Sequence, residues 1–193
     1  MPGDAEMKKI KISTNAFIYP MPIVLVGSVI GDQVNFMAAG WVSRVNYQPP
    51  LIAVAIHKGH YTAAGIREHG QFGVSIPGRG LIEQVDYVGL VSGKEHDKSR
   101  VFTHFTGELL HAPMIQACPL TMECSLVQAV DLPTNTLFIG EIKGAYADEQ
   151  CLTDGEPDIK KMEPLTLTMP DNSYWAVGEY LGKAWSIGKK YLK

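Results

Sequence analysis

Two short segments of the sequence carry side chains that suit a phosphate group. His60-Tyr61-Thr62 begins a stretch of helix-forming residues, and a helix N-terminus attracts anions because its first N–H groups are unpaired. The hydroxyl of Thr62 adds one more donor. A later loop offers the hydroxyl of Ser92, the flexible backbone at Gly93 and the ammonium of Lys98. Together these groups predict a phosphate site.

Each segment also has a plainer interpretation. Thr62, or His60 just before it, can cap its own helix without holding any ligand. The loop around Lys98 can be a solvated turn whose charges face water. If the loop does hold an anion, Asp97 is expected to keep Lys98 in place. Both interpretations stay open at the level of the sequence.

A third segment, residues 35–41, has small residues at its centre and an indole at its end. Ala38, Ala39 and Gly40 would let a planar ring approach the backbone closely, and Asn35 offers an amide for a polar edge. A phosphate site beside such a flat surface suggests a phosphorylated aromatic cofactor. The alternative is a packed pair of strands in which small residues lie opposite large ones.

Other kinds of site find no support in the sequence. The six histidines show no zinc spacing and no His-Glu-x-x-His motif, so no metal site is expected. The glycine motifs of P-loop and Rossmann nucleotide sites are absent. Cys118 and Cys124 are expected on one face of a strand, within the core. Glu123 is a charge on that core-like strand, and the sequence assigns it no role.

Composition excludes several partners. The formal net charge is −3, so the chain lacks the excess of positive charge that is typical of proteins that bind nucleic acid. The longest apolar stretch, residues 21–30, is interrupted by Pro22 and Gly27 and is about half the length of a membrane span, so no membrane interaction is expected. Three cysteines, an odd number, fit a reducing cytoplasm.

The patterning predicts mainly β structure in one domain, residues 13–182, between an N-terminal leader at 1–12 and a C-terminal tail at 183–193. Strands are expected at residues 23–30, 34–39, 41–46, 51–57, 72–76, 119–129, 137–147 and 165–169. Helices are expected at 61–69, ending at Gly70, and at 81–91, with a short helix or an ordered loop at 98–105. Hairpins and long alternating strands favour an antiparallel barrel.

The order of these segments resembles the flavin reductase-like, FMN-binding split-barrel family, with the flavoredoxin branch nearest. The resemblance rests on Pro22-Ile23-Val24-Leu25-Val26, residues 35–41, Gln48-Pro49-Pro50-Leu51, Tyr61-Thr62, Phe72, Ser92-Gly93, Asp97-Lys98, Glu123-Cys124 and Gly140-Glu141-Ile142. The ordered set, and no single motif, carries it.

This resemblance implies an antiparallel split β-barrel of Greek-key type, assembled as a homodimer with one FMN per subunit near the interface. The isoalloxazine ring would face the backbone of residues 37–41, and Thr62, Ser92 and Lys98 would contact the phosphate. The expected cofactor-binding residues are Asn35, Met37, Ala38, Ala39, Gly40, Trp41, His60, Tyr61, Thr62, Ser92, Gly93 and Lys98. Some relatives have Ser in place of Gly40, so one hydroxyl contact to the ring is expected to be missing.

Three functions are compatible with this resemblance. The first is an FMN flavoprotein that passes electrons from a reductase or a ferredoxin-like donor to an acceptor. The second is an NAD(P)H:flavin oxidoreductase, and the third is a barrel that binds ligand without catalysis. The flavin supplies the redox chemistry, so no catalytic acid or base is assigned. Tyr174, Trp175 and Tyr180 would either cover the partner's flavin edge or fill the dimer core.

Overall fold

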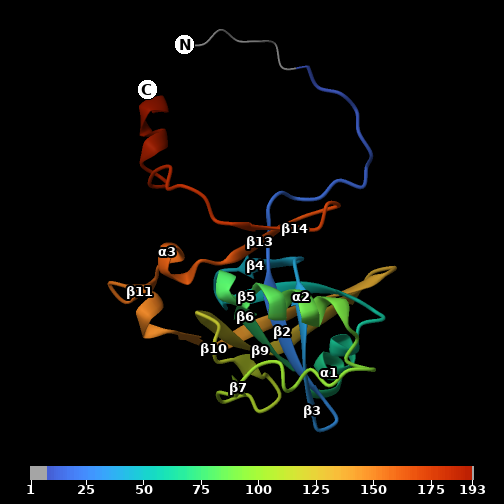
Figure 1. The fold of residues 1–193 in the computed structure, drawn as a ribbon. Coiled ribbons are helices and arrows are strands. Elements are labelled where there is room, and N and C mark those ends of the chain that lie inside the picture. The colour runs from blue at the N-terminus through green and yellow to red at the C-terminus, as the bar shows by residue number, and fades with distance from the viewer. Residues whose placement is uncertain (1–7, 193) are drawn as a thin grey trace.

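The computed structural model describes residues 8–192, so residues 1–7 of the predicted leader and Lys193 lie outside the described residues. The fold is mainly β, as predicted (Figure 1). The strands are β1 (Met21–Pro22), β2 (Val24–Ile30), β3 (Gln33–Ala39), β4 (Val42–Asn46), β5 (Leu51–His57), β6 (Gln71–Ile76), β7 (His104–Phe105), β8 (Met114–Ile115), β9 (Leu120–Asp131), β10 (Asn135–Ala147), β11 (Leu152–Thr153), β12 (Glu156–Pro157), β13 (Leu165–Thr168) and β14 (Ser173–Ala176). The α-helices are α1 (Tyr61–His69), α2 (Ile82–Leu90) and α3 (Ile159–Met162).

Seven strands form one antiparallel sheet in the order β3-β2-β6-β9-β10-β5-β4. Strands that are distant in the chain are neighbours in the sheet, as expected for a Greek key. β3 and β4 are the two edges, and only Gly40 and Trp41 connect them. In the described chain no strand pairing joins these two edges, so the barrel is split there. Strands β1, β13 and β14 form a separate three-stranded sheet.

Strand β2 is buried on both faces, which explains its nearly continuous apolar sequence. Val24 and Val26 pack into the barrel interior with Phe72. Ile23, just before the strand, and Leu25 pack into a second cluster outside the sheet, with Val85 and Val88 from α2. Because successive side chains of a strand point to opposite faces, one strand can serve both clusters.

Helix α1 packs against β2, and this contact fixes the position of its N-terminus. Its buried face consists of Thr62, Ala63, Gly65 and Ile66. A Cβ on Gly65 would lie 2.3 Å from the carbonyl oxygen of Val29, so glycine permits the close approach despite its lower helix propensity. The helix ends at Gly70 in the left-handed conformation, as predicted.

The predicted strands and the two longer helices are confirmed to within a few residues, with two corrections. The half-buried strand expected at 41–46 is mostly exposed, because β4 is a sheet edge that nothing in the single chain covers. Of the two alternatives for residues 98–105, the loop is confirmed for 98–103, and it leads into β7. Cys118 and Cys124 are buried but do not share a face, because Cys118 precedes β9 and packs in the outer cluster, whereas Cys124 packs inside the barrel.

Glu123 proves to be a buried structural carboxylate. Its oxygens accept hydrogen bonds from the backbone N–H of Leu109 at 2.8 Å and of Glu108 at 3.2 Å, and from the hydroxyl of Tyr146 at 2.8 Å. The side chain therefore holds the loop before β8 against the sheet, and these three hydrogen bonds offset the free-energy cost of burying the carboxylate.

Within residues 8–192, no helix is long and apolar enough to cross a membrane.

Candidate functional site

A cavity of about 390 Å³ lies between β3, the N-terminus of α1, the C-terminus of α2 and the loop that follows α2. We call it the anion cavity. It brings together nine of the twelve residues predicted from the sequence, which are Asn35, Met37, Ala38, His60, Tyr61, Thr62, Ser92, Gly93 and Lys98. The two segments that suit a phosphate therefore meet in space.

Thr62, in the first turn of α1, faces β3 and does not cap its helix. Its Oγ1 accepts a hydrogen bond from Nδ2 of Asn35 at 2.7 Å, and both side chains are buried. His60 occupies the N-cap position, but its side chain makes no capping bond. The plainer interpretation of both residues as caps is therefore wrong. Among the described residues, Oδ1 of Asn35 is buried without a hydrogen-bond partner.

Lys98 is buried, with only 4% of its surface exposed. Its Nζ donates to the carbonyl oxygen of Val88, in the last turn of α2, at 2.8 Å. No carboxylate within the described part of the chain forms a salt bridge with it, and burial lowers the pKa of this ammonium. The interpretation of Lys98 as a solvated charge is therefore wrong, and two of its three N–H donors remain available.

Asp97 does not hold Lys98, contrary to the expectation. Its carboxylate accepts hydrogen bonds from the backbone N–H and the hydroxyl of Ser99, at 2.9 Å and 2.6 Å. These bonds lower the pKa of Asp97. The carboxylate thus shapes the loop locally, and Lys98 depends on burial and on the end of α2 for its position.

Gly93 allows the loop after α2 to close onto β3. A Cβ at this position would lie 2.1 Å from Oδ1 of Asn35 and 2.9 Å from the ring of Tyr61. Any larger residue must therefore displace the loop or its neighbours. The hydroxyl of the adjacent Ser92 accepts a hydrogen bond from the N–H of Lys94 at 3.2 Å, which forms the turn at the cavity wall.

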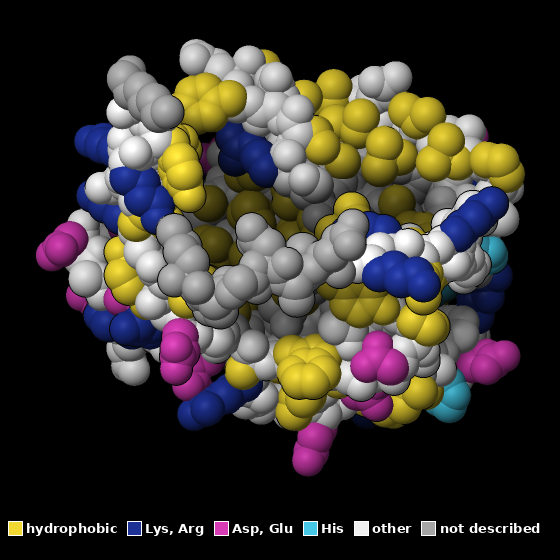
Figure 2. All heavy atoms as spheres, turned by 90° about the horizontal axis from the view of Figure 1, so that it is seen from above, with side chains coloured by type: hydrophobic (Ala, Val, Ile, Leu, Met, Phe, Trp, Pro, Cys, Tyr) yellow, Lys and Arg dark blue, Asp and Glu magenta, His cyan; other side chains and the backbone are white. Residues whose placement is uncertain are grey.

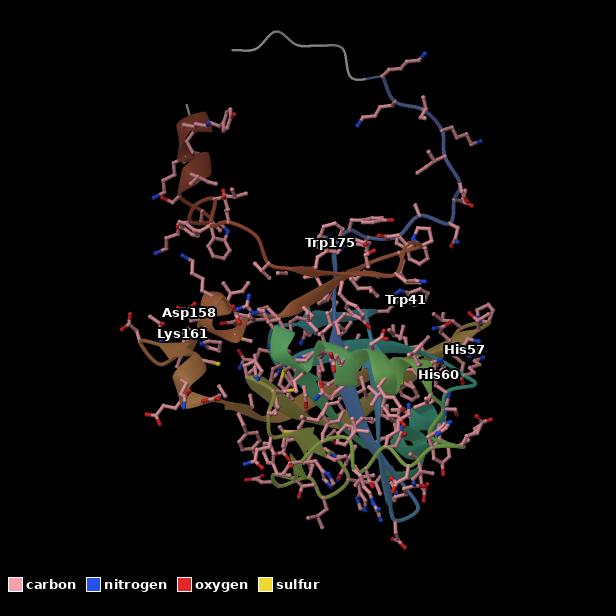
Figure 3. All side chains as sticks on the ribbon, viewed as in Figure 1. Trp41, His57, His60, Asp158, Lys161 and Trp175 are labelled. Carbon is pink, nitrogen blue, oxygen red and sulfur yellow. The ribbon has the colours of Figure 1, made fainter. Side chains whose placement is uncertain are left out.

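The electrostatics of the cavity favour an anion. No residue that lines it carries a carboxylate, and the first turn of α1 contains no acidic residue. The imidazoles of His57 and His60 lie 5.8 Å apart (Figure 3). Shielding from solvent, and then the nearby His57 and Lys98, lower the pKa of His60. Sequence reasoning missed His57 and the end of α2, although the spacing of His57 three residues before His60 was an available signal.

The other three predicted residues lie outside this cavity. Ala39 is buried in the barrel core. Gly40 and Trp41 line a larger groove of about 900 Å³, which is bounded by residues 15–18, by β4 and β5, and by Met169. We call it the apolar groove, because no residue that lines it is charged. Trp41 is half exposed there, and hydrophobic side chains surround a hollow on the face seen in Figure 2.

Strand β3 connects the two regions. Asn35 and Met37 border the anion cavity, and the chain reaches the apolar groove at Gly40. Because β3 is a sheet edge, alternate backbone groups on its outer side are free of sheet pairing. An elongated ligand with an anionic end and a flat end could thus lie along this strand, from the anion cavity to the apolar groove.

Comparison with known proteins identifies the family. The Flavin reductase like domain matches residues 16–167. The chain belongs to this family. Flavoredoxin from Methanosarcina acetivorans is 54% identical, with a TM-score of 0.94 over 95% of this chain and 99% of that protein. Flavoredoxin of Desulfovibrio vulgaris (Miyazaki F) is 41% identical, with a TM-score of 0.85 over 93% of this chain and 100% of that protein.

A protein of Archaeoglobus fulgidus without an assigned function is also similar, with 32% identity over 74% of this chain and 81% of its own length. The family and the two flavoredoxins confirm the resemblance that the ordered sequence segments indicated, including its flavoredoxin branch. The split-barrel fold class is confirmed with it.

Proposed function

We propose that this flavin reductase-like protein is a flavoredoxin-like flavoprotein, which holds FMN and passes electrons through it. The observation that carries the proposal is the anion cavity, where a buried ammonium without a carboxylate partner lies beside Thr62 and the N-terminus of α1. Burying an unpaired charge is costly, so such a group is expected where a ligand supplies the missing charge.

The residues present fit the ribityl phosphate part of FMN. Phosphate oxygens would accept from the two remaining N–H groups of Lys98, from the hydroxyls of Thr62 and Ser92, and from the first N–H groups of α1. A hydroxyl of the ribityl chain would satisfy the unpartnered Oδ1 of Asn35. The polar groups of the cavity named here would thus receive partners of the right kind.

The flat end of the ligand would lie along β3 toward the apolar groove. Small side chains at Ala38 and Gly40 let a ring approach the backbone, and the N–H groups near Gly40 and Trp41 would donate to its polar edge. Bound FMN supplies the transfer of electrons or hydride. Donors at that edge stabilise the negative charge that reduction brings, by the same electrostatic principle as an oxyanion hole.

The proposal includes a homodimer. Trp41, Val45 and Tyr47 lie at or next to the exposed edge strand β4, and each is at least about half exposed in the single chain. Contiguous apolar surfaces of this kind mark interaction sites in soluble proteins. A second subunit would cover this surface and shield the ring end of the ligand from water.

Titration of flavin-free protein with FMN, FAD and riboflavin tests the proposal. We expect one FMN per chain, and riboflavin binding weaker by about tenfold or more, because it lacks the phosphate. Equal affinity for FMN and riboflavin, or no flavin binding, would contradict it.

Anaerobic reduction of the FMN complex then distinguishes the three functions. Reduction by NADH or NADPH would indicate an NAD(P)H:flavin oxidoreductase, and reduction by a reduced ferredoxin alone would indicate an electron carrier. Reduction by none of these donors would favour a non-catalytic barrel.

A further inference from the structure

The last segment of the described chain has an apolar surface that its own domain does not cover. Residues 177–192, here called the C-terminal arm, follow β14 and leave the same end of the domain as the N-terminal segment (Figure 1). The hydrogen bonds of the described arm residues all stay within the arm, as in the turn where the N–H of Ser186 donates to the carbonyl oxygen of Lys183. Its large exposed apolar side chains are Val177, Tyr180, Leu181, Trp185, Ile187, Tyr191 and Leu192.

Exposure on this scale is unfavourable for an isolated chain. Trp185 is 95% exposed and Leu181 is 88% exposed. Burying a side chain of this size stabilises a protein by more than most other single contacts, so seven exposed together indicate a surface that awaits a partner. The apolar groove is a matching acceptor, since it is large, uncharged and lined by Trp41 and Val45.

The direction of β14 carries the arm away from the groove of its own chain. Met169, which borders the groove, lies at the tip of the β13–β14 hairpin, next to Ser173. β14 then runs back to Ala176, which pairs with Leu165 at the other end of the hairpin. The arm starts from that end and continues outward (Figure 1). No residue of the described arm lines the groove of its own chain.

Charge favours an arm that docks on a second copy. Residues 177–192 contain three lysines and one glutamate, a net charge of +2, whereas the rest of the chain carries −5, for a total of −3. A basic arm is therefore attracted to the acidic body of another subunit, which raises the rate and the specificity of docking. In a dimer with a two-fold axis, the arm of each subunit would lie in the groove of the other. Both grooves would then be filled, and no further subunit could add.

We propose that the C-terminal arm of each subunit docks in the apolar groove of a second copy of this chain. This inference rests on the proposed function in one respect. The groove is lined by Gly40 and Trp41, so the partner's arm would complete the wall beside the flavin ring. The occupied groove then belongs to two chains, and the ring environment is incomplete in either one alone.

A complementation experiment on the flavin-free protein tests the exchange. One variant carries Val45→Glu, which places a charge in the groove. The other carries Leu181→Ser and Trp185→Ser, which remove apolar side chains that are exposed in the single chain. Each variant alone is expected to weaken dimerisation by about 100-fold or more, because every dimer it forms has two damaged contacts. An equimolar mixture should form a one-to-one heterodimer, because one intact arm then meets one intact groove.

Light scattering and native mass spectrometry of the separate and mixed variants give the readout. Val127→Glu is the control for the charge, since Val127 is exposed on β9 outside the groove, and Leu110→Ser is the control for the arm. Both controls should dimerise like the unmodified chain. A monomeric unmodified chain, variants that still dimerise fully, or a mixture that stays monomeric would overturn the proposal. Flavin titration of the same samples reports separately on FMN binding.

Discussion

The anion cavity and the apolar groove are built in opposite ways, although a single strand connects them. In the cavity, each polar side chain has a fixed position within one chain, because Asn35 bonds to Thr62 and Lys98 bonds to the end of α2. In the groove, most of the lining side chains are apolar and none is charged, and its β4 side is an uncovered sheet edge. Under the proposed function, the site for the phosphate is therefore preformed in one chain, whereas the surroundings of the ring depend on assembly.

This contrast has a measurable signature in the ratio of FMN affinity to riboflavin affinity. Substitutions in the cavity should change the ratio, because only FMN carries the phosphate. Substitutions in the groove should weaken both ligands equally.

The largest effect is expected in the groove, for Val45→Glu. Val45 is 49% exposed in the single chain, so the variant should fold, but dimerisation would bury the new carboxylate without a partner. Such burial costs several kcal/mol, so the dimer dissociation constant should rise about 100-fold or more. FMN and riboflavin should weaken by the same factor in flavin titrations. A changed ratio of FMN affinity to riboflavin affinity would mean that the groove also contributes to phosphate binding.

The next largest effect is expected in the cavity, for Gly93→Ala. The added Cβ would lie 2.1 Å from Oδ1 of Asn35, so the loop that carries Ser92 must move. Overpacking of this kind costs about 1–3 kcal/mol, and we expect FMN affinity to fall by about 5- to 150-fold. Riboflavin affinity should fall much less. The control is Gly80→Ala, where nothing lies within 4 Å of the added Cβ.

A smaller effect is expected for Thr62→Val, which keeps the shape of the side chain but removes the acceptor of the Asn35 hydrogen bond. The buried amide of Asn35 would lose its partner, at a cost of about 1–3 kcal/mol in the free energy of unfolding. FMN affinity should fall as well. Thr62→Ser restores the hydroxyl and should recover both quantities in denaturation and titration experiments. Failure of serine to rescue would show that the methyl group, and not the hydrogen bond, matters.

The smallest effect concerns pH. Shielding from solvent, and then the nearby His57 and Lys98, lower the pKa of His60 in the flavin-free protein. A bound phosphate would favour the charged imidazole and raise that pKa, so binding takes up protons and FMN affinity increases as pH falls. We expect an increase of about two- to fivefold between roughly pH 8 and pH 6.5, above the second phosphate pKa of about 6. Calorimetry in buffers of different ionisation enthalpy measures the proton uptake, and His60→Asn should abolish it.

Most of the cavity residues could be predicted from the sequence because the order of the segments along the chain resembles the family, whereas each segment alone also had a plainer interpretation. His57 was missed although it lies three residues before His60, because that spacing alone does not indicate an anion site. Glu123 needed the structure, since its partners are backbone groups of a loop that is distant in sequence. The position of Gly40 and Trp41 in a second region was also hidden. It follows from the sheet order, which places β3 and β4 at opposite edges.

The central claim is that Lys98 holds a phosphate. The most direct test is the ratio of FMN to riboflavin affinity in Lys98→Met, which keeps the buried stem and removes the charge, compared with Lys94→Met in the same loop. Lys94 is exposed, so its variant is the matched control. A hydrogen bond to a charged group contributes about 1.5–3 kcal/mol, so Lys98→Met should lower the ratio by about 10- to 150-fold, with riboflavin affinity unchanged. An unchanged ratio in a folded Lys98→Met protein would contradict the account.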